Sequence, residues 1–350
     1  MIKEQNKTFC SNDWMYRSLN NESIEIALYQ GNSTQVTIPE NIDGLRVTRI
    51  GDKAFYQSEI QDVMMPDSIT EIGDSCFSQC LSLETAKFSS NLISIGAYAF
   101  SETKIMKNDV KLPDTVQTIG NFAFSNCRRS GTFTFQFGEN MTNLGIGLFY
   151  DSFLGKIVLP NKPLDMRGVL YTDGRECSNL QVDLGKSNKY FVYEDGVLFN
   201  NKKSVIYHSS YVYKETENFL SYTEYFVPNS VQEIGPQAFT QRYTLRSLSV
   251  PTGLKIVGKD MLFRFEELND MNNYADYSYD TRIKKLTIRD QVIDGIKQNV
   301  LINIPTEGKQ NLLDETRQYF KMNKDGTFFD LTAYDNSFAG RTSKVDKILM

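Results

Sequence analysis

Residues 110–124 have the sequence VKLPDTVQTIGNFAF, and this stretch contains every element of a pattern that recurs along the chain. It begins with an apolar-x-apolar-Pro segment, continues to Ile119-Gly120 and, after two more residues, ends with the small-aromatic pair Ala123-Phe124. Short alternation of apolar and polar residues is typical of a β-strand, and a proline ends such a strand because it has no N–H to donate. The stretch therefore predicts a strand, a turn at Pro113 and a second turn at Gly120, where glycine permits a positive φ or a close backbone approach.

The Ile-Gly element recurs at a nearly constant interval. The glycines at positions 51, 73, 96, 120 and 145 are separated by 22, 23, 24 and 25 residues, and a phenylalanine follows each of them four residues later. Further copies occur at Ile234-Gly235 and, in weaker form, at Val257-Gly258. A unit this short cannot bury its own apolar face, so it must stack on its neighbours. The spacing predicts a solenoid of about eight or nine stacked units.

The same pattern resembles a known repeat family. Residues 65–83, MPDSITEIGDSCFSQCLSL, follow the phrase IP-x-x-V-x-x-IG-x-x-AF-x-x-C-x-x-L, which is similar to the BspA-type leucine-rich repeats of bacteria. The opening segment 14–55 looks like the first unit of that family, and residues 188–200 look like its usual long insertion. The resemblance covers roughly residues 14–320. Ser89 and Gly138 depart from it, because they stand where other units have proline.

The resemblance implies an α/β-type repeat solenoid of the leucine-rich-repeat class. Short parallel strands are expected on one face, with turns and short helical or 3-10 segments on the other. We expect one continuous solenoid domain with an N-terminal cap at 1–35, repeat units at 36–184, a hairpin-like insertion at 185–222, repeat units at 223–290 and a C-terminal cap and tail at 291–350. A helix is expected around residues 311–320, and both caps would hide the open ends of the core.

Charge and hydropathy exclude several protein classes. The formal net charge is -5, and no run of Lys or Arg is longer than a pair, which argues against a nucleic-acid-binding protein. No stretch approaches the roughly 18 apolar residues that span a bilayer. Residues 1–10 lack the apolar centre of a secretory signal. We therefore expect either a cytoplasmic protein or an exported one whose signal has been removed.

The cysteines are expected to be structural. Cys80, Cys127 and Cys177 occupy one slot of the repeat, and Cys76 replaces the alanine of the small-aromatic pair, so all four are predicted to be small buried core residues. Equivalent slots lie one unit apart along a solenoid, so we expect no metal site, and the sequence indicates no cofactor. Cys10 lies outside the repeats, where it is expected to be exposed and able to pair between chains.

His208 is the only histidine, which leaves little scope for Ser/His or Cys/His catalysis. It follows Ile206-Tyr207 at the end of the expected insertion hairpin, and we predict a surface or hairpin role for it. No sequence feature places two carboxylates on opposite sides of a cleft, as glycoside hydrolysis requires. The sequence therefore predicts no catalytic residue.

Residues between the inward apolar positions of each strand must point outward, and stacking aligns them in rows. We name one row the central row: it comprises Thr37, Met64, Lys87, Lys111, Gln136, Val158, Phe226, Ser249 and Thr287. The row has no dominant charge and is a candidate surface for binding a protein or a glycan. A merely solvated sheet face is the alternative.

Tyrosines are concentrated around the expected insertion. Tyrosine is enriched at recognition surfaces because it combines a large contact area with one polar group. These residues form a second candidate binding surface, the tyrosine patch, which comprises Tyr190, Tyr193, Tyr207, Tyr211 and Tyr213. The alternative is that they shield an irregular part of the chain from water.

The resemblance also implies a function. Proteins of this family are often bacterial surface or secreted proteins implicated in adhesion to host matrix proteins or to other cells. It implies a non-catalytic interaction scaffold, extracellular or on the cell surface, whose partner is a host or matrix protein or a glycan. A structural or assembly protein without a small-molecule ligand is the alternative, and a glycan-active enzyme is a remote one.

Overall fold

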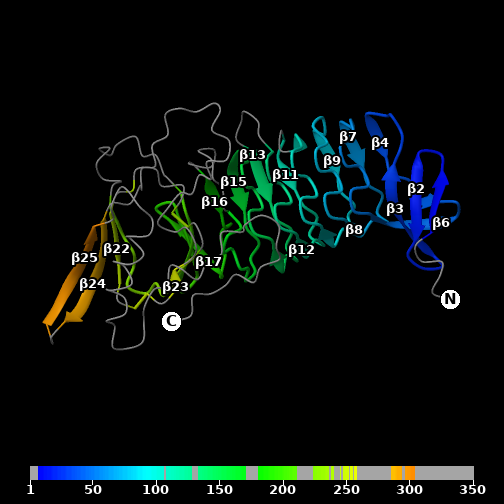
Figure 1. The fold of residues 1–350 in the computed structure, drawn as a ribbon. Helices are drawn as coiled ribbons and strands as arrows, with labels where there is room; N and C mark the ends of the chain where they lie inside the picture. The colour runs from blue at the N-terminus through cyan, green and yellow to red at the C-terminus, as the bar shows by residue number, and fades with distance from the viewer. Residues whose placement is uncertain are drawn as a thin grey trace, which may run out of the picture. The chain divides into compact units, whose positions relative to one another are not determined.

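The computed structural model describes residues 7–105, 108–127, 133–170, 180–210, 224–235, 238–239, 245, 247–251, 253–254, 256–257, 285–293 and 296–303 of the 350. The chain divides into two units, Met1–Phe191 and Val192–Met350, and each is described by itself. Apart from a 3-10 position at Ile105, the regular structure in the described ranges consists of β-strands (Figure 1). The helix expected around residues 311–320 lies outside these ranges.

The longest sheet of unit 1 begins in the N-terminal cap. Three antiparallel strands come first, and from β3 onward β6 and then two-residue strands, each ending just before an Ile-Gly or Leu-Gly glycine, continue the sheet in parallel. The order along the sheet is β1 (Thr8–Ser11), β2 (Trp14–Ser18), β3 (Ser23–Tyr29), β6 (Leu45–Ile50), β8 (Glu71–Ile72), β10 (Ser94–Ile95), β12 (Thr118–Ile119) and β14 (Asn143–Leu144), with β5 (Asn41–Ile42) paired to β6.

A second line of parallel strands in unit 1 is formed by the apolar-x-apolar segments. It consists of two sheets: β4 (Gln35–Thr37), β7 (Asp62–Met64) and β9 (Thr85–Lys87), then β11 (Val110–Lys111), β13 (Phe133–Gln136), β15 (Leu154–Val158) and β16 (Gln181–Asp183). We name the outer surface of this line the strand face. Each coil therefore contributes to two sheets, where the sequence predicted strands on one face alone.

The third side of each coil consists of turns, so the predicted α/β class is wrong and the described chain is a β-solenoid without helices. Lys53 and Gln57 have φ values of 59° and 60°, and such left-handed residues interrupt the run of right-handed residues that a helix needs. Their amides donate to the next coil instead of along a helix. The Phe55 N–H, between them, donates to the Cys76 carbonyl at 2.9 Å.

Unit 2 repeats the two-sheet arrangement. One sheet contains β17 (Phe191–Glu194), β18 (Val197–Asn200), β19 (Val205–Ser209), β21 (Glu233–Ile234) and β23 (Ile256–Val257), and the other contains β20 (Glu224–Phe226), β22 (Ser247–Val250), β24 (Lys285–Ile293) and β25 (Ile296–Asn303). β18 and β19 form an antiparallel pair inside the segment predicted to be an insertion. β19 also pairs in parallel with β21, so this hairpin is built into the sheet.

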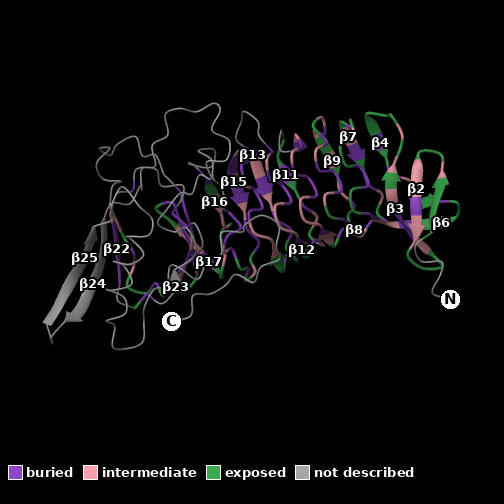
Figure 2. Cartoon of the chain, viewed as in Figure 1, coloured by how far each residue is buried: buried purple, intermediate pink, exposed green. Residues whose placement is uncertain are grey.

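A stack of aromatic rings fills the centre of unit 1, and Figure 2 colours the buried stretches of the chain purple. Phe55, Phe77, Phe100 and Phe124 follow one another at centroid distances of 4.9, 5.1 and 5.3 Å, and Phe149 continues the stack at 6.3 Å. All five rings are fully or almost fully buried. One ring per coil thus forms the core, and each ring depends on the coils on both sides for its contacts.

The N-terminal cap closes this stack with two further aromatic residues. Tyr29 stacks on Phe55 at 5.1 Å, and Trp14 lies against Tyr29 at 5.0 Å. The cap therefore gives the first coil the ring contacts that a preceding coil would otherwise supply.

The repeated glycines are required by close approach of neighbouring coils. A Cβ on Gly73 would lie 2.6 Å from the backbone nitrogen of Asp52, and one on Gly120 would lie 2.3 Å from that of Ala97. Neither glycine has a positive φ. The sequence allowed two explanations for these glycines, a positive φ or a close backbone approach. The structure shows that the close approach requires them.

Acidic side chains connect successive coils at the corners. Asp52 accepts a hydrogen bond from the Asp74 N–H at 3.0 Å, and Asp74 accepts one from the Ala97 N–H at 2.7 Å. At the proline corner, Asp67 accepts bonds from the N–H and the hydroxyl of Ser90 at 3.0 and 2.8 Å. The Ser90 N–H, followed by its hydroxyl, holds the pKa of Asp67 below its usual value.

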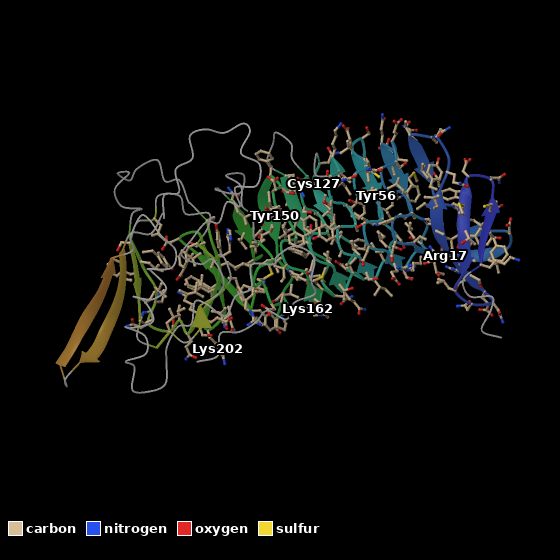
Figure 3. All side chains as sticks on the ribbon, in the orientation of Figure 1. Arg17, Tyr56, Cys127, Tyr150, Lys162 and Lys202 are labelled. Carbon is tan, nitrogen blue, oxygen red and sulfur yellow. The ribbon has the colours of Figure 1, made fainter. Side chains whose placement is uncertain are left out.

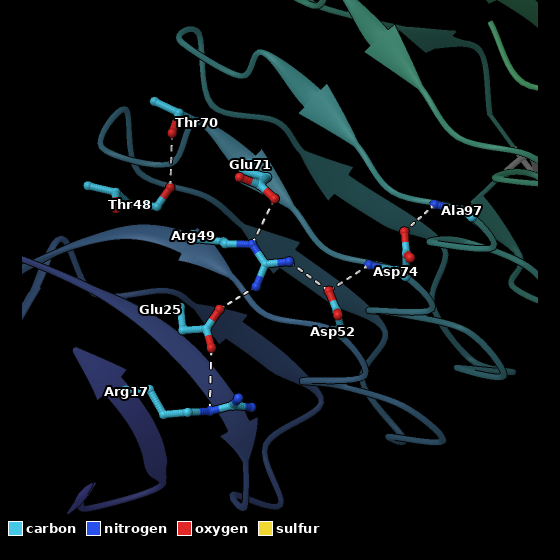
Figure 4. A network of polar contacts seen from close by, with 9 residues as sticks. All are labelled: Arg17, Glu25, Thr48, Arg49, Asp52, Thr70, Glu71, Asp74 and Ala97. Carbon is cyan, nitrogen blue, oxygen red and sulfur yellow. Dashed lines mark hydrogen bonds and ion pairs between the residues drawn. The ribbon is translucent and has the colours of Figure 1, made fainter. Parts of the chain in front are cut away.

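Arg49 joins the cap to the first coils (Figure 4). Its guanidinium contacts Glu25 of β3, Asp52 at 2.7 Å and Glu71 at 2.8 Å, and Glu25 also pairs with Arg17 at 3.4 Å. Burial opposes the charge on Arg49, but hydrogen bonds to Glu71 and Glu25 outweigh it and raise its pKa. The network replaces water around a half-buried cation with three carboxylates.

Replacement of Phe77 by Ala should remove about 3–5 kcal/mol from the free energy of unfolding, because it leaves a cavity between two stacked rings. Urea denaturation of purified protein measures this loss, with Leu81→Ala as control. Leu81 is 62% exposed, so its truncation should change stability by less than about 0.5 kcal/mol. Equal losses in the two variants would contradict a core built on the stack. If the Ala variant does not fold, Phe77→Leu should show a smaller loss.

The contribution of Asp67 should depend on pH. Its folded pKa is lowered, so its stabilisation is full above the unfolded pKa of about 3.9 and is lost as pH falls through the folded pKa. The stability difference between the native chain and Asp67→Asn should therefore be larger at pH 7 than at about pH 2.5. Urea midpoints at both pH values test this, with the exposed Glu59→Gln as control. A difference that does not change with pH would refute it.

Candidate functional site

The central row is aligned across unit 1. Thr37 lies opposite Met64 and Met64 opposite Lys87, and in the second sheet Lys111, Gln136 and Val158 lie opposite one another. The exposed members are Thr37, Met64, Lys87 and Lys111, while Gln136 and Val158 are half-buried. Met64 is 46% exposed, an unusually open position for a large apolar side chain in a strand.

The members of the row in unit 2 are also aligned, since Phe226 lies opposite Ser249 and Ser249 opposite Thr287. Phe226 is 62% exposed. Ser249 is buried, with 6% of its surface exposed, so the expectation that it faces solvent is wrong. The side chain of Thr287 lies outside the described residues. Unit 1 therefore carries the larger described part of the candidate surface.

Charges beside the central row are partly neutralised by local pairs. Lys156 of β15 pairs with Asp183 of β16 at 2.7 Å, and this lysine holds the pKa of Asp183 below its usual value. Asp109 accepts the backbone N–H of Thr134 at 2.7 Å. The strand face thus has a mixed character, with exposed lysines but no extended region of one charge.

A slot interrupts the strand face between β9 and β11, and sequence analysis did not predict it. Its volume is about 510 Å³, and its lining includes Lys87, Phe88, Ile105, Lys111 and Leu112. The only signal in the sequence is local: the preceding unit has Met65-Pro66 where this one has Phe88-Ser89. A departure from a repeat does not by itself show whether two strands will pair.

The tyrosine patch is only partly described. Tyr190 is 36% exposed, whereas Tyr193 and Tyr207 are half-buried in β17 and β19. The hydroxyl of Tyr193 lies 3.3 Å from that of Ser210. Tyr211 and Tyr213 lie outside the described residues, and the patch as a binding surface stays a prediction.

The prediction of buried cysteines is confirmed for Cys76, Cys80 and Cys127, of which Figure 3 labels Cys127, and Cys10 is exposed as expected. Cys177 lies outside the described residues. Burial raises the pKa of Cys80 to about 12 and that of Cys127 to about 11. Their thiolates are therefore scarce at neutral pH, and such thiols are poor nucleophiles and poor metal ligands.

His208 is buried within β19, with 2% of its surface exposed. It lies in the antiparallel pair of β18 and β19, which agrees with the hairpin alternative of the prediction, and its side chain is buried where the surface alternative would have exposed it. The described residues bring together no group of three or more His, Cys, Asp or Glu side chains that could hold a metal ion. In the same residues, no helix has the length and apolarity needed to cross a membrane.

Comparison with known families gives one match that covers most of the chain. The model of the BspA type leucine rich repeat region, in 6 copies, matches residues 10–129, 48–180 and 207–303. No curated protein matches the sequence.

Solved structures of bacterial leucine-rich repeat proteins have a similar fold. A leucine rich cell surface protein from Faecalibacterium prausnitzii is 22% identical, with a TM-score of 0.52 and 73% of each chain covered. The pneumococcal vaccine antigen PcpA is 20% identical, with a TM-score of 0.53, and the match covers 75% of this chain and 70% of that one. A leucine-rich repeat protein from Eubacterium ventriosum is 18% identical at a TM-score of 0.50, covering 80% and 71%. These likenesses show a shared fold.

The buried thiols should resist modification in the folded protein. In a Cys177→Ser background, a thiol reagent at pH 8 should label Cys10 within minutes and leave Cys76, Cys80 and Cys127 unlabelled until urea unfolds the chain. Peptide mapping by mass spectrometry identifies the labelled cysteines. Rapid labelling of Cys80 or Cys127 without denaturant would contradict their burial in the core.

Proposed function

Since the chain belongs to the BspA-type leucine-rich repeat family, we propose that it acts at the cell surface or outside the cell and recognises proteins of a host or of an extracellular matrix. The family and the solved structures of similar fold support the coarser statement that the chain is a protein-interaction scaffold. The similarity to the leucine rich cell surface protein of Faecalibacterium prausnitzii supports the location. The proposal involves no catalytic residue, metal or cofactor.

The strand face of unit 1 carries the proposal. Except at the interruption between β9 and β11, its strands pair with those of the neighbouring coils, so binding there would order few residues and would lose little conformational entropy. Its exposed side chains combine apolar Met64 with cationic Lys87 and Lys111. An apolar centre with charged neighbours is the usual composition of a protein-protein interface. A polyanion would instead need a continuous basic surface.

The proposal predicts that the purified chain binds at least one immobilised matrix protein, such as fibronectin, laminin or collagen, at micromolar concentration in surface plasmon resonance. A Thr37→Glu/Met64→Glu variant should bind at least tenfold more weakly, because it places two carboxylates on the exposed central row. Leu81→Glu is the matched control, since Leu81 is exposed but lies outside the strands of this face.

Two results would count against the proposal. Absence of binding to every immobilised protein would favour the structural or assembly alternative, and binding to immobilised glycans alone would move the partner to another class of molecule. Circular dichroism must first show that both variants keep the native β signal. Binding that survives in the double variant would exclude this part of the strand face as the contact surface.

A further inference from the structure

Strand pairing on the strand face of unit 1 stops at one position. β7 pairs with β9, and β11 pairs with β13, but β9 and β11 belong to separate sheets. In the preceding coil the Met65 N–H donates to the Lys87 carbonyl at 3.0 Å. The equivalent bond from Phe88 to Lys111 is not formed in the described structure. Each of the two facing edges therefore has backbone groups that could pair with a further strand.

The interruption is closed at both ends, which distinguishes it from a frayed sheet. At one end the Lys104 N–H donates to the Leu83 carbonyl at 2.9 Å, and at the other the Thr115 hydroxyl donates to the Ser90 carbonyl, also at 2.9 Å. The open space between the strands has a volume of about 510 Å³, within the range of about 300–1,000 Å³ that ligand pockets occupy. The space is therefore a bounded slot within the sheet.

The inner lining of the slot is apolar. Ile105 and Leu112 are buried, and the half-buried ring of Phe88 lies edge-on to Phe100 at 5.7 Å. Small apolar side chains that entered the slot would be removed from water against these three residues.

The outer rim of the slot is cationic at one end. Lys87 ends β9 and Lys111 ends β11, and both side chains are exposed. The charge of Lys87 also contributes to lowering the pKa of Asp67, after the hydrogen bonds from Ser90. Glu84 and Asp109 stand at the other end, where Asp109 is held by the Thr134 N–H of the next coil. A single carboxylate between the two lysines fits this arrangement, whereas the acidic residues at the other end would repel a polyanion.

We propose that the slot between β9 and β11 binds a short extended peptide segment with a central acidic residue. The main chain of the peptide pairs with a free strand edge, as in β-augmentation. Alternate side chains point to opposite sides of an extended chain, so two apolar residues face Phe88, Ile105 and Leu112 while the acidic residue between them faces Lys87 and Lys111. The inference rests on the proposed function, because the segment would belong to a protein partner.

Calorimetric titration of the full chain with three synthetic peptides tests this binding mode. The probes are the acetylated and amidated peptide Ser-Val-Glu-Val-Ser, its analogue with Lys for Glu, and the Glu peptide N-methylated at both valines. The Glu peptide should bind at least tenfold more tightly than either of the others. The Lys analogue loses the charge complementarity, and N-methylation removes the N–H groups that pair with the strand edge.

Protein variants locate the site. The Lys87→Met/Lys111→Met variant keeps the apolar part of both side chains and should bind the Glu peptide at least tenfold more weakly. Lys186 is another exposed lysine of unit 1, and Lys186→Met should leave the affinity for this peptide unchanged. Hydrogen exchange measured by mass spectrometry should slow in segments 84–90 and 108–113 when the peptide is bound. A change of exchange elsewhere, with none in these segments, would overturn the proposal.

Equal affinity for the Glu and Lys peptides, or no binding of the Glu peptide at millimolar concentration, would also overturn it. These failures differ from failure of the scaffold function, whose test uses Thr37 and Met64 outside the slot. A chain that binds matrix proteins but not the peptide refutes the slot alone. A chain that binds the peptide but none of the matrix proteins refutes the matrix-recognition proposal alone.

Discussion

The stacking distance between coils is the constraint on which the rest of unit 1 depends. Each coil must bring its backbone within hydrogen-bonding reach of the next on three sides while one aromatic ring fills the space between them. Gly73 and Gly120 meet this requirement at the tightest corner, where any side chain would collide with the neighbouring backbone. Asp52 and Asp67 meet it at the outer corners by accepting N–H groups of the following coil. The sequence repeats because each coil must meet the same stacking distance to its neighbour.

Much of this architecture could be predicted because its determinants are local. The spacing of glycines 51 to 145 predicted the stacked units, the phenylalanines predicted the core, and the family resemblance is confirmed. The turns of the third side were mistaken for short helices, since Lys53 and Gln57 are residue types that give no sign of a left-handed backbone. Burial of Ser249 and His208, and the gap between β9 and β11, depend on contacts between segments that no local pattern records.

The candidate binding surface separates into a regular part and an irregular part. Along the central row, strand register alone fixes the positions of Thr37, Met64 and Lys87, so the sequence was sufficient to align them. The slot arises where the register is not continued, and there the two lysines are separated by unpaired backbone. A surface of this kind can combine broad contact through its side chains with directional contact through its main chain.

The interruption between β9 and β11 also has a mechanical consequence. A stack of coils bonded on three sides resists bending, because bending in any direction must lengthen hydrogen bonds on at least one side. Across the slot only two sides remain bonded, through the β10–β12 pair and through turn contacts such as that of the Tyr98 N–H with the Asn121 carbonyl at 2.9 Å. Fewer backbone hydrogen bonds therefore resist bending here than between the coils that pair on all three sides, and a strand bound in the slot would add bonds that resist it.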